Sequence, residues 1–273
     1  MTCGIRGIGY STSVTEHAHA RSDSTISTNS VRLAAQPIAE GGTPVEVWTR
    51  WRRHFPPLKV DDCPAFVLVA AHPDDETLGL GATAAMLSGR GVTVQLVTVT
   101  DGEAAYPDDG RSPKELAKVR REELVAAAVR LGLPRPIFLR IPDGEVASHE
   151  QRLVTKLGAV LAGFERGTWC AATWRADGHP DHEATGRAAA AAAKTADAVF
   201  LEYPIWMWHW AAPDDPEVPW HRARRLPLTA LGQETKTAAL QCFSSQLEAG
   251  DMPPVLTPEV VQRQIAVGEI VFV

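Results

Sequence analysis

Between residues 66 and 76 the chain reads Phe66-Val67-Leu68-Val69-Ala70-Ala71-His72-Pro73-Asp74-Asp75-Glu76. Its apolar beginning is typical of a strand that is buried on both faces of a sheet. One imidazole and three carboxylates follow at once, before a glycine-containing helix that we predict from about Leu78 to Ser88. Because ligands bind outside the carboxyl ends of parallel strands, these polar groups lie where a site is expected.

The rest of the chain continues this alternation of apolar strands and amphipathic helices. Such a pattern predicts a single α/β domain with a mostly parallel sheet that is covered by helices on both faces. The predicted strands are 66–71, 92–99, 137–141, 168–174 and 198–201, and the predicted helices are 78–88, 113–131, 150–164 and 182–195.

The amino-terminal part differs in composition from this domain. Residues 1–43 are rich in Ser, Thr, Gly and His and show no sustained periodicity, which predicts a loosely ordered extension. A short amphipathic helix is predicted next, where Trp48, Trp51 and Phe55 recur at helical spacing. We therefore divide the chain into an extension, 1–43, and one domain, 44–273.

The overall composition excludes several classes of protein. The chain has 273 residues, of which 45% are hydrophobic and 22% charged, as in ordinary globular proteins. Its formal net charge of −6 argues against a nucleic-acid partner. No apolar run approaches the ~20 residues of a membrane span, and the amino terminus lacks the apolar run of a secretory signal. The four cysteines lie far apart, so we expect no disulfides and a cytoplasmic location.

A second cluster of polar residues, His179-Pro180-Asp181-His182, follows the strand predicted at 168–174. Acidic residues also follow the second and third predicted strands, in Asp101-Gly102-Glu103 and Pro142-Asp143-Gly144. Carboxylates gathered on one rim of a sheet repel one another unless a positive group lies among them. The two His/Asp clusters therefore predict one metal site that is assembled from both.

The residue types of the two clusters suit a hydrolytic metal site. Zinc and similar ions in hydrolases take three protein ligands of the His and carboxylate type and leave one position for water. We expect His72 and Asp75, across a tight turn, and His182, at the start of its own helix, to be these ligands. Asp74 then lies beside the metal, where it can act as the general base on water that attacks an amide or ester.

The remaining members of the second cluster are expected to assist. His179 would face the other side of the substrate carbonyl, where it could stabilise the oxyanion or protonate the leaving amine. Asp181 would hold the His179 ring in one tautomer. The alternative for the first cluster is structural, because Asp74 and Asp75 are also favoured by the dipole at a helix N-terminus. Proline after the first histidine of each cluster fixes the local turn and favours the metal site.

A competing pattern occupies the same place. Gly79-Leu80-Gly81-Ala82-Thr83-Ala84 resembles a dinucleotide-binding fingerprint, with Asp101 about twenty residues further on. However, Asp74, Asp75 and Glu76 would bring three negative charges to the place of the pyrophosphate. We therefore interpret the glycines as permitting close helix-to-sheet packing. A non-catalytic dinucleotide- or sugar-binding protein is kept as the alternative of another class.

At these residues the chain resembles the PIG-L/LmbE-like N-acetylsugar deacetylases. The two histidine motifs are the specific part of the resemblance, and the helical pieces support it. The matching pieces run in the family's order from about residue 64 to residue 247. They are 71–79, 100–103, 120–124, 131–132, 142–144, 179–182, 236–240 and 245–246.

The resemblance implies a single Rossmann-like domain with zinc held by His72, Asp75 and His182. Another divalent metal such as Fe2+ is the alternative to zinc. The resemblance also implies that Asp74 is the general base and that His179 assists the tetrahedral intermediate.

The same resemblance implies which residues contact the substrate and reveals one position at which this chain differs from some members. It implies that Arg120 and Asp143 contact the substrate, although Arg120 could instead form a surface ion pair with Glu123. Mycothiol-type members carry a tyrosine two residues before the first histidine of the second motif, and Asp177 stands there in this chain.

The tryptophan-rich segment from Trp206 to Trp220 is a further departure from compact sugar-only members. Such tryptophans either pack a core or lid, or form an aromatic wall in which Trp206 contacts a bulky substrate. We therefore expect zinc-dependent hydrolysis of the N-acetyl (or N-acyl) amide of an N-acetylglucosaminyl group, foremost on a glycopeptide-antibiotic pseudoaglycone. The alternative is a thiol-pathway glucosaminyl-inositol or another small N-acetylglucosaminide. Either partner is a small-molecule glycoconjugate.

Overall fold

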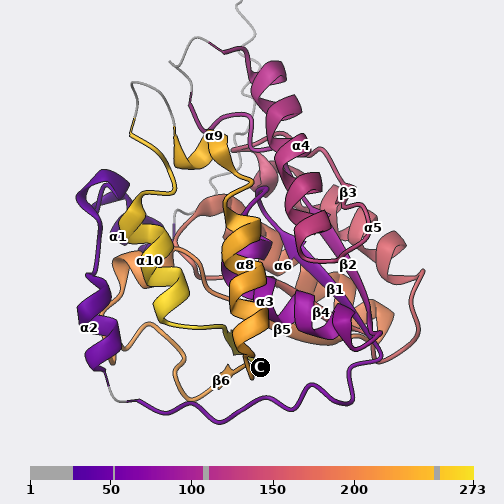
Figure 1. Cartoon of the computed structure of the whole chain (residues 1–273). Coiled ribbons are helices and arrows are strands. Elements are labelled where there is room, and N and C mark those ends of the chain that lie inside the picture. The colour runs from indigo at the N-terminus through magenta and orange to yellow at the C-terminus, as the bar shows by residue number, and fades with distance from the viewer. Residues whose placement is uncertain (1–26, 52, 107–110, 249–252) are drawn as a thin grey trace, which may run out of the picture.

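The computed structural model describes residues 27–51, 53–106, 111–248 and 253–273 (Figure 1). The strands in these ranges form one sheet in the order β3-β2-β1-β4-β5-β7-β6. They are β1 (Ala65–Ala70), β2 (Thr93–Thr98), β3 (Ile137–Phe138), β4 (Trp169–Thr173), β5 (Val199–Tyr203), β6 (Ala223–Arg225) and β7 (Ile270–Phe272). The α-helices are α1 (Thr28–Ala34), α2 (Val45–Arg50), α3 (Asp75–Gly89), α4 (Pro113–Arg130), α5 (Glu150–Leu161), α6 (Pro180–Ala196), α7 (Met207–Trp210), α8 (Ala230–Leu240), α9 (Ser244–Leu247) and α10 (Pro258–Ala266). Two short 3-10 helices complete the set, η1 (Ile38–Glu40) and η2 (Val146–His149).

The predicted α/β fold is confirmed. Strands β1 to β5 are parallel, and β7 pairs antiparallel with both β5 and β6. The third predicted strand, 137–141, is too long, because β3 pairs with β2 only through Ile137 and Phe138. Its extended path continues nonetheless, since the backbone N–H groups of Leu139 and Ile141 donate to carbonyls of Thr98 and Val99.

Strand β1 shows why the sequence around it is apolar at every position. Phe66 and Leu68 belong to the core on the face covered by α3, α4 and α8. Val67 and Val69 belong to the core on the opposite face, which α5 and α6 cover (Figure 1). Because successive side chains of a strand point to opposite faces, a strand covered on both sides has no polar position.

The sheet order places both polar clusters at one crevice. Strands β1 and β4 are neighbours, and the chain moves away from them in opposite directions, to β2 and β3 on one side and to β5 on the other. Such a reversal of strand order opens a crevice at the carboxyl ends of the two strands. His72 follows β1 and His179 follows β4, so the fold brings the two motifs together.

Helix α3 starts earlier than predicted and is interrupted. It begins at Asp75 rather than Leu78, and Leu80 has non-helical backbone angles (φ −139°, ψ 20°). The interruption is stabilised from outside the helix, because the backbone N–H groups of Ala82 and Thr83 donate to the Glu269 carboxylate, each at 2.8 Å. Glu269 therefore caps the second half of α3 in the way that an N-cap residue caps a helix.

The glycines of α3 serve helix packing, as predicted. A Cβ atom on Gly79 would overlap the ring of Tyr203 in β5, and a Cβ atom on Gly81 would lie 3.4 Å from Lys236 in α8. The absence of a side chain at Gly79 is thus required for the helix to approach the sheet. The structure supports this interpretation of the glycines over a nucleotide cradle.

The amino-terminal extension is more ordered than predicted within its described part, 27–43. This part contains α1 and η1, and Ser27 caps α1 by accepting a hydrogen bond from the N–H of Ser30 at 3.0 Å. Asn29 donates to the Ala176 carbonyl at 2.9 Å, in the loop before the second histidine motif. We call residues 27–43 the N-terminal strap. Residues 1–26, for which we also predicted a loose extension, lie outside the described residues.

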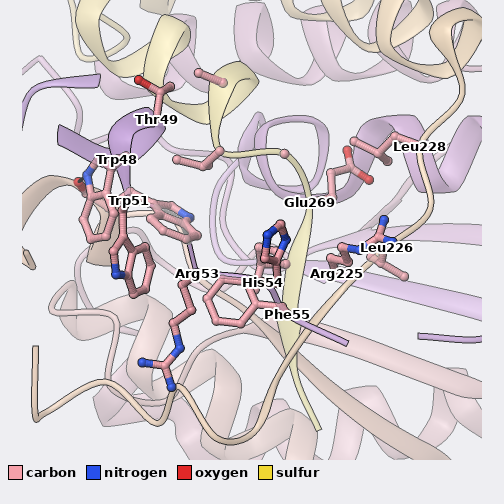
Figure 2. A pocket seen from close by; sticks show the side chains of 15 residues that line it. Trp48, Thr49, Trp51, Arg53, His54, Phe55, Arg225, Leu226, Leu228 and Glu269 are labelled. Carbon is pink, nitrogen blue, oxygen red and sulfur yellow. Dashed lines mark hydrogen bonds between the residues drawn. The ribbon is translucent and has the colours of Figure 1, made fainter. Parts of the chain in front are cut away.

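Two of the four tryptophans of the predicted wall pack in an aromatic cluster. Trp208 and Trp220 are buried and form edge or tilted ring contacts with Trp48 of α2. Helix α2 ends at Arg50, earlier than predicted, but Trp51 still contacts Trp220 at a ring-centroid distance of 4.7 Å. A cavity of about 480 Å³ lies beside this cluster, with Trp48, Trp51 and Phe55 on one side and Glu269, Leu226 and Leu228 on the other (Figure 2).

The helices carry no membrane-spanning segment within the residues that the structure describes. None of these helices combines sufficient length with sufficient hydropathy to cross a bilayer.

Candidate metal centre and active-site cavity

Three of the predicted ligands converge on one point at the crevice between β1 and β4. Asp75 Oδ2 lies 3.5 Å from His72 Nδ1 and 3.2 Å from His182 Nε2. The two ring nitrogens are themselves 3.2 Å apart. His182 is completely buried and Asp75 nearly so, at 0% and 3% exposure, whereas His72 is partly exposed and lines the cavity described below.

These spacings fit a tetrahedral divalent ion. Donor atoms about 2.0–2.1 Å from a tetrahedral zinc ion lie roughly 3.3–3.4 Å from one another. The three atoms of His72, Asp75 and His182 already have nearly that separation. Two histidines and one carboxylate are also a usual donor set for a catalytic zinc site and suit ferrous iron.

The local electrostatics favour a cation at this point. Burial alone would lower the pKa of His182, but Asp75 and Asp177 raise it to about 9. The pKa of Asp75 is held far below its usual value despite its burial, because His182 and His72 lie against it. A metal ion can take the place of the protons that these groups would otherwise share.

Asp177 orients His182, which our sequence reasoning missed. Its Oδ2 lies 2.8 Å from His182 Nδ1, so Nε2 is the nitrogen that faces Asp75. The Asp177 carboxylate also accepts the backbone N–H groups of Ile205, Trp206 and Met207 at 2.9–3.0 Å. One buried carboxylate therefore joins the metal centre to the segment that carries Trp206. From the sequence we considered Asp177 only because mycothiol-type members carry a tyrosine at this place. The pattern Asp-x-His-Pro-Asp-His was the signal that pointed to its role.

Asp74 occupies a strained and electrostatically unusual position. Its φ of 130° lies in the region that favours glycine, and the residue is 4% exposed. Its Oδ2 forms an ion pair with Arg120 Nη2 at 3.1 Å. Burial raises the pKa of Asp74 to about 8, although Arg120 acts to lower it. A carboxylate whose pKa lies near neutrality can accept and return a proton at physiological pH.

His179 is held as a neutral imidazole. Burial, together with the neighbouring His72 and His182, lowers its pKa to about 3. Its Nδ1 accepts the backbone N–H of Asp181 at 3.2 Å, so the ring proton of the neutral form resides on Nε2. This tautomer can donate a hydrogen bond to an oxyanion, whereas a neutral imidazole is a poor acid for protonating an amine.

Asp181 lies on a different histidine from the one predicted. Its carboxylate accepts the N–H groups of Gly144 at 2.7 Å and Val146 at 3.2 Å, and it lies 3.4 Å from His72 Nε2. The expectation that this carboxylate holds the His179 ring is therefore wrong, since the backbone of Asp181 contacts that ring instead. The carboxylate helps to orient His72.

Arg120 is buried inside the site rather than paired at the surface. Only 3% of it is exposed, and its guanidinium donates to the carbonyls of Gly102 at 2.9 Å and Pro73 at 2.8 Å. The alternative of a surface ion pair with Glu123 is wrong, because Glu123 accepts hydrogen bonds from Ser244 and Ser245, the first two residues of α9. Arg120 thus holds the Asp74 carboxylate in place through their ion pair.

Asp143 joins the loops after β2 and β3 to the metal centre. Its Oδ1 lies 3.0 Å from His72 Nε2, and its Oδ2 accepts the N–H of Ala104 at 2.8 Å. Asp143 and Asp181 therefore lie beside Nε2 of the His72 imidazole, and the other two predicted ligands, Asp75 and His182, lie beside its Nδ1. These contacts hold the ring with Nδ1 toward Asp75 and His182.

One cavity of about 370 Å³ receives these groups. Two of the residues that line it, Gln246 and Arg120, each have a buried side-chain atom without a hydrogen-bond partner among the described residues, Oε1 and Nε respectively. The predicted contacts Arg120, Asp143 and Trp206 all line it, whereas Asp181 and His182 lie behind the wall. Gln246 was recognised in the sequence only as part of a supporting motif. The lining comprises Ile38, His72, Asp74, Asp75, Leu78, Ala104, Ala105, Arg120, Asp143, Gly144, His179, Ile205, Trp206, Gln246, Val255, Leu256 and Val260.

Comparison with known structures shows the same fold elsewhere. An N,N'-diacetylchitobiose deacetylase from Pyrococcus horikoshii superimposes with a TM-score of 0.56 at 24% identity, over 69% of this chain and 72% of that one. A zinc-inhibited form of teicoplanin deacetylase superimposes with a TM-score of 0.58 at 17% identity, over 69% and 87%.

Comparison of sequences finds related deacetylases. A 1D-myo-inositol 2-acetamido-2-deoxy-alpha-D-glucopyranoside deacetylase from Mycolicibacterium gilvum (strain PYR-GCK) is 31% identical over 167 residues, which cover 50% of this chain and 56% of that protein. The chain spans about half the length of the curated relatives it matches. Residues 67–193, which contain both histidine motifs, match the model of the PIG-L family of GlcNAc-PI de-N-acetylases. Over these residues the chain resembles the PIG-L family.

Proposed function

We propose that this protein is a metal-dependent deacetylase of an N-acetylglucosaminyl glycoside. One observation carries the proposal: donor atoms of His72, Asp75 and His182 lie within 3.5 Å of one another, beside a cavity that is lined by Asp74, a buried carboxylate with a pKa of about 8. A metal site, a general base and an oxyanion donor in one cavity are the groups that amide hydrolysis requires.

In the proposed reaction a divalent ion, held by His72, Asp75 and His182, supplies the Lewis acidity that activates water and polarises the amide. Asp74 accepts a proton from the attacking water as its oxygen bonds to the acetyl carbon. The Nε2–H of His179 donates a hydrogen bond to the carbonyl oxygen as that atom becomes negative. Asp74 then returns its proton to the departing nitrogen, the C–N bond breaks, and the products are acetate and a free amine.

Zinc is the proposed metal, with ferrous iron as the alternative. Both ions accept histidine nitrogen and carboxylate oxygen, so the donor set alone favours neither. The solved teicoplanin deacetylase whose fold resembles this chain was captured in a zinc-inhibited form. A metal titration should therefore extend well beyond one equivalent, because an excess of zinc can reduce the rate.

The relatives favour the inositol glycoside over the glycopeptide as substrate class. The curated relatives, at 31–36% identity, are named for a 2-acetamido-glucopyranoside of myo-inositol. The teicoplanin deacetylase resembles the chain in fold alone, at 17% identity. The order of substrates that we drew from the sequence therefore reverses: a small glucosaminide comes first and a pseudoaglycone second.

The decisive test joins metal analysis to acetate release. Purified protein should contain about one divalent ion per chain and release acetate from an N-acetylglucosaminide, and exhaustive chelation should abolish the release until metal is restored. The panel comprises N-acetylglucosamine, its inositol glycoside and a glycopeptide pseudoaglycone. Tight binding of a dinucleotide by protein that holds no metal and releases no acetate would favour the non-catalytic alternative.

A further inference from the structure

Besides the acids and imidazoles, part of the lining of the active-site cavity consists of aliphatic side chains and one indole. These residues come from the N-terminal strap, from the loop after β2, from the segment after β5 and from the region of α10. They are Ile38, Ala105, Ile205, Trp206, Val255, Leu256 and Val260, and we call them the apolar wall.

Ile38 is presented to the cavity by a firmly held strap. His209 donates from Nε2 to the carbonyl of Gln36 at 2.9 Å, and Arg263 donates to the carbonyl of Gly41 at 2.6 Å. His209 and Arg263 also contact each other, with Nδ1 and Nη2 3.1 Å apart. The backbone on both sides of Ile38 is thus fixed to buried groups of α7 and α10.

The other parts of the apolar wall are also held in place by backbone hydrogen bonds. Ile205 and Trp206 donate their N–H groups to Asp177, and the N–H of Val255 donates to the Tyr106 hydroxyl at 2.9 Å. Ile205 and Trp206 are 2% and 6% exposed, so their side chains are already desolvated before a ligand arrives. A preformed apolar surface of this kind binds ligands without an ordering cost.

The chemistry of this wall discriminates between aglycones. A polyol pressed against aliphatic side chains loses hydrogen bonds to water and gains none, which costs binding free energy. An alkyl or aryl group placed there gains about 25 cal/mol for each Å² of apolar surface removed from water. The cavity volume of about 370 Å³ is near the small end of ligand pockets, so it suits a sugar with one small group attached.

We propose that the apolar wall is a subsite for an alkyl or aryl group on the aglycone, so that this protein prefers apolar N-acetylglucosaminides to the inositol glycoside named for its relatives. The inference rests on the proposed deacetylase function for its kinetic consequences. It does not follow from the family match, because Ile38, Ile205, Trp206, Val255, Leu256 and Val260 all lie outside residues 67–193.

The first test compares substrates on the wild-type protein. Acetate release is measured for phenyl, methyl and inositol glycosides of N-acetylglucosamine. The phenyl glycoside should have at least a tenfold higher kcat/KM than the other two, as expected for filling a hydrophobic subsite. Equal values for the phenyl and inositol glycosides overturn the proposal while leaving the deacetylase function intact.

The second test changes the wall at a position that tolerates substitution. Ile38 is only partly buried, so Ile38→Ser should fold, and its melting temperature verifies this. KM for the phenyl glycoside should rise about tenfold with kcat unchanged, and KM for the methyl glycoside should stay the same. Ile38→Leu should restore the phenyl preference. The matched control is Val31→Ser, in the same strap but 59% exposed, which should change neither value.

A binding measurement separates this proposal from the proposed function. Phenyl glucosaminide, which has no acetyl group to lose, should bind the metal-loaded protein about tenfold more tightly than methyl glucosaminide in calorimetry, and Ile38→Ser should remove the difference. This result with no deacetylation of any substrate would keep the subsite and reject the enzyme. A preference for longer N-acyl chains on the methyl glycoside, lost in Ile38→Ser, would assign the wall to the acyl group and overturn the proposal.

Discussion

The polar and apolar halves of the active-site cavity come from different parts of the chain. His72, Asp74, Asp75, Arg120, Asp143 and His179 all fall within residues 67–193, the part that matches the family model. Most of the apolar wall comes from the N-terminal strap and from residues after 204. The half that we propose performs the chemistry thus lies within the residues that match the family model, whereas the half that we propose contacts the rest of the substrate lies mostly outside them.

The two halves are also held by different interactions. In the polar half, carboxylates such as Asp177 and Asp181 each accept several hydrogen bonds, so ligand positions are fixed to within a narrow range. The apolar half contacts ligand through side chains without directional bonds, and only its backbone is fixed. We therefore expect changes in the polar half to abolish catalysis or metal binding, and changes in the apolar half to alter only substrate preference.

The largest effect should come from replacing Asp74, the proposed general base. In Asp74→Asn the amide oxygen can still accept from Arg120, and asparagine tolerates the positive φ, but it cannot take a proton. We expect kcat to fall by roughly 10²–10⁴-fold for every substrate while the metal content stays unchanged. Steady-state kinetics and elemental analysis of the same preparation check both statements.

The matched control for this change is Asp61→Asn, whose side chain is 83% exposed. It should leave kcat and metal content unaltered. Loss of the metal from Asp74→Asn would show that Asp74 is a ligand rather than a base, and would contradict the assignment.

The next effect should appear in metal affinity. In Asp177→Asn the amide oxygen can still accept from His182. The amide NH2 group then faces the backbone N–H groups of Ile205 and Met207, which need an acceptor that it does not offer. Loss of such a supporting partner typically weakens metal binding 10–100-fold. Competition with a chelating dye measures the change, and exposed Asp214→Asn in the same region serves as the control. An unchanged metal affinity would show that Asp177 only binds the backbone of the segment after β5 and does not support the metal centre.

The polar half could be predicted from the sequence because its signals are local. His72, Asp74 and Asp75 lie within four positions, next to an apolar run whose burial on both faces is itself a local pattern. The turn between strand and helix then fixes where these side chains point. The second motif obeys the same rule, and the switch of strand order between β1 and β4 brings the two together.

The contacts that sequence reasoning missed are distant in the chain. Glu269 caps the second half of α3 from nearly two hundred residues away, and Gln246 enters the cavity from a turn whose motif carried no periodic signal. The order in the N-terminal strap was missed for the same reason. Its composition is polar and irregular, and its stability comes from partners such as Arg263 and His209 rather than from its own sequence.

A smaller effect is expected on the pH dependence of the rate. Burial raises the pKa of Asp74 to about 8 even though the Arg120 guanidinium acts to lower it, and a bound cation lowers it further. Since the base acts only when deprotonated, the rate should fall as the pH drops through this pKa. In Arg120→Gln the positive charge is gone, so the acidic limb of the kcat profile should move to higher pH by roughly one unit.

The control for the pH experiment is the neighbouring arginine on the same helix. Arg121 pairs with Asp101 rather than with Asp74, so Arg121→Gln removes an equal charge without touching the base. Its acidic limb should coincide with that of the wild type. Equal shifts in both variants would indicate a general surface-charge effect and not the ion pair with Asp74.

The smallest predicted effect distinguishes the two halves of the cavity by the substrates whose KM changes. Gln246 lines the cavity, and its buried Oε1 has no partner among the described residues, so we expect a sugar hydroxyl to donate to it. Removing one such hydrogen bond in Gln246→Ala should raise KM about threefold. Because every glucosaminide carries the sugar, the increase in KM should be the same for phenyl, methyl and inositol glycosides, unlike the selective effect of Ile38→Ser.

The control is Gln233→Ala, on the exposed side of α8, which should leave all three KM values unchanged. An increase confined to the phenyl glycoside would place Gln246 with the apolar wall and erase the division between the halves.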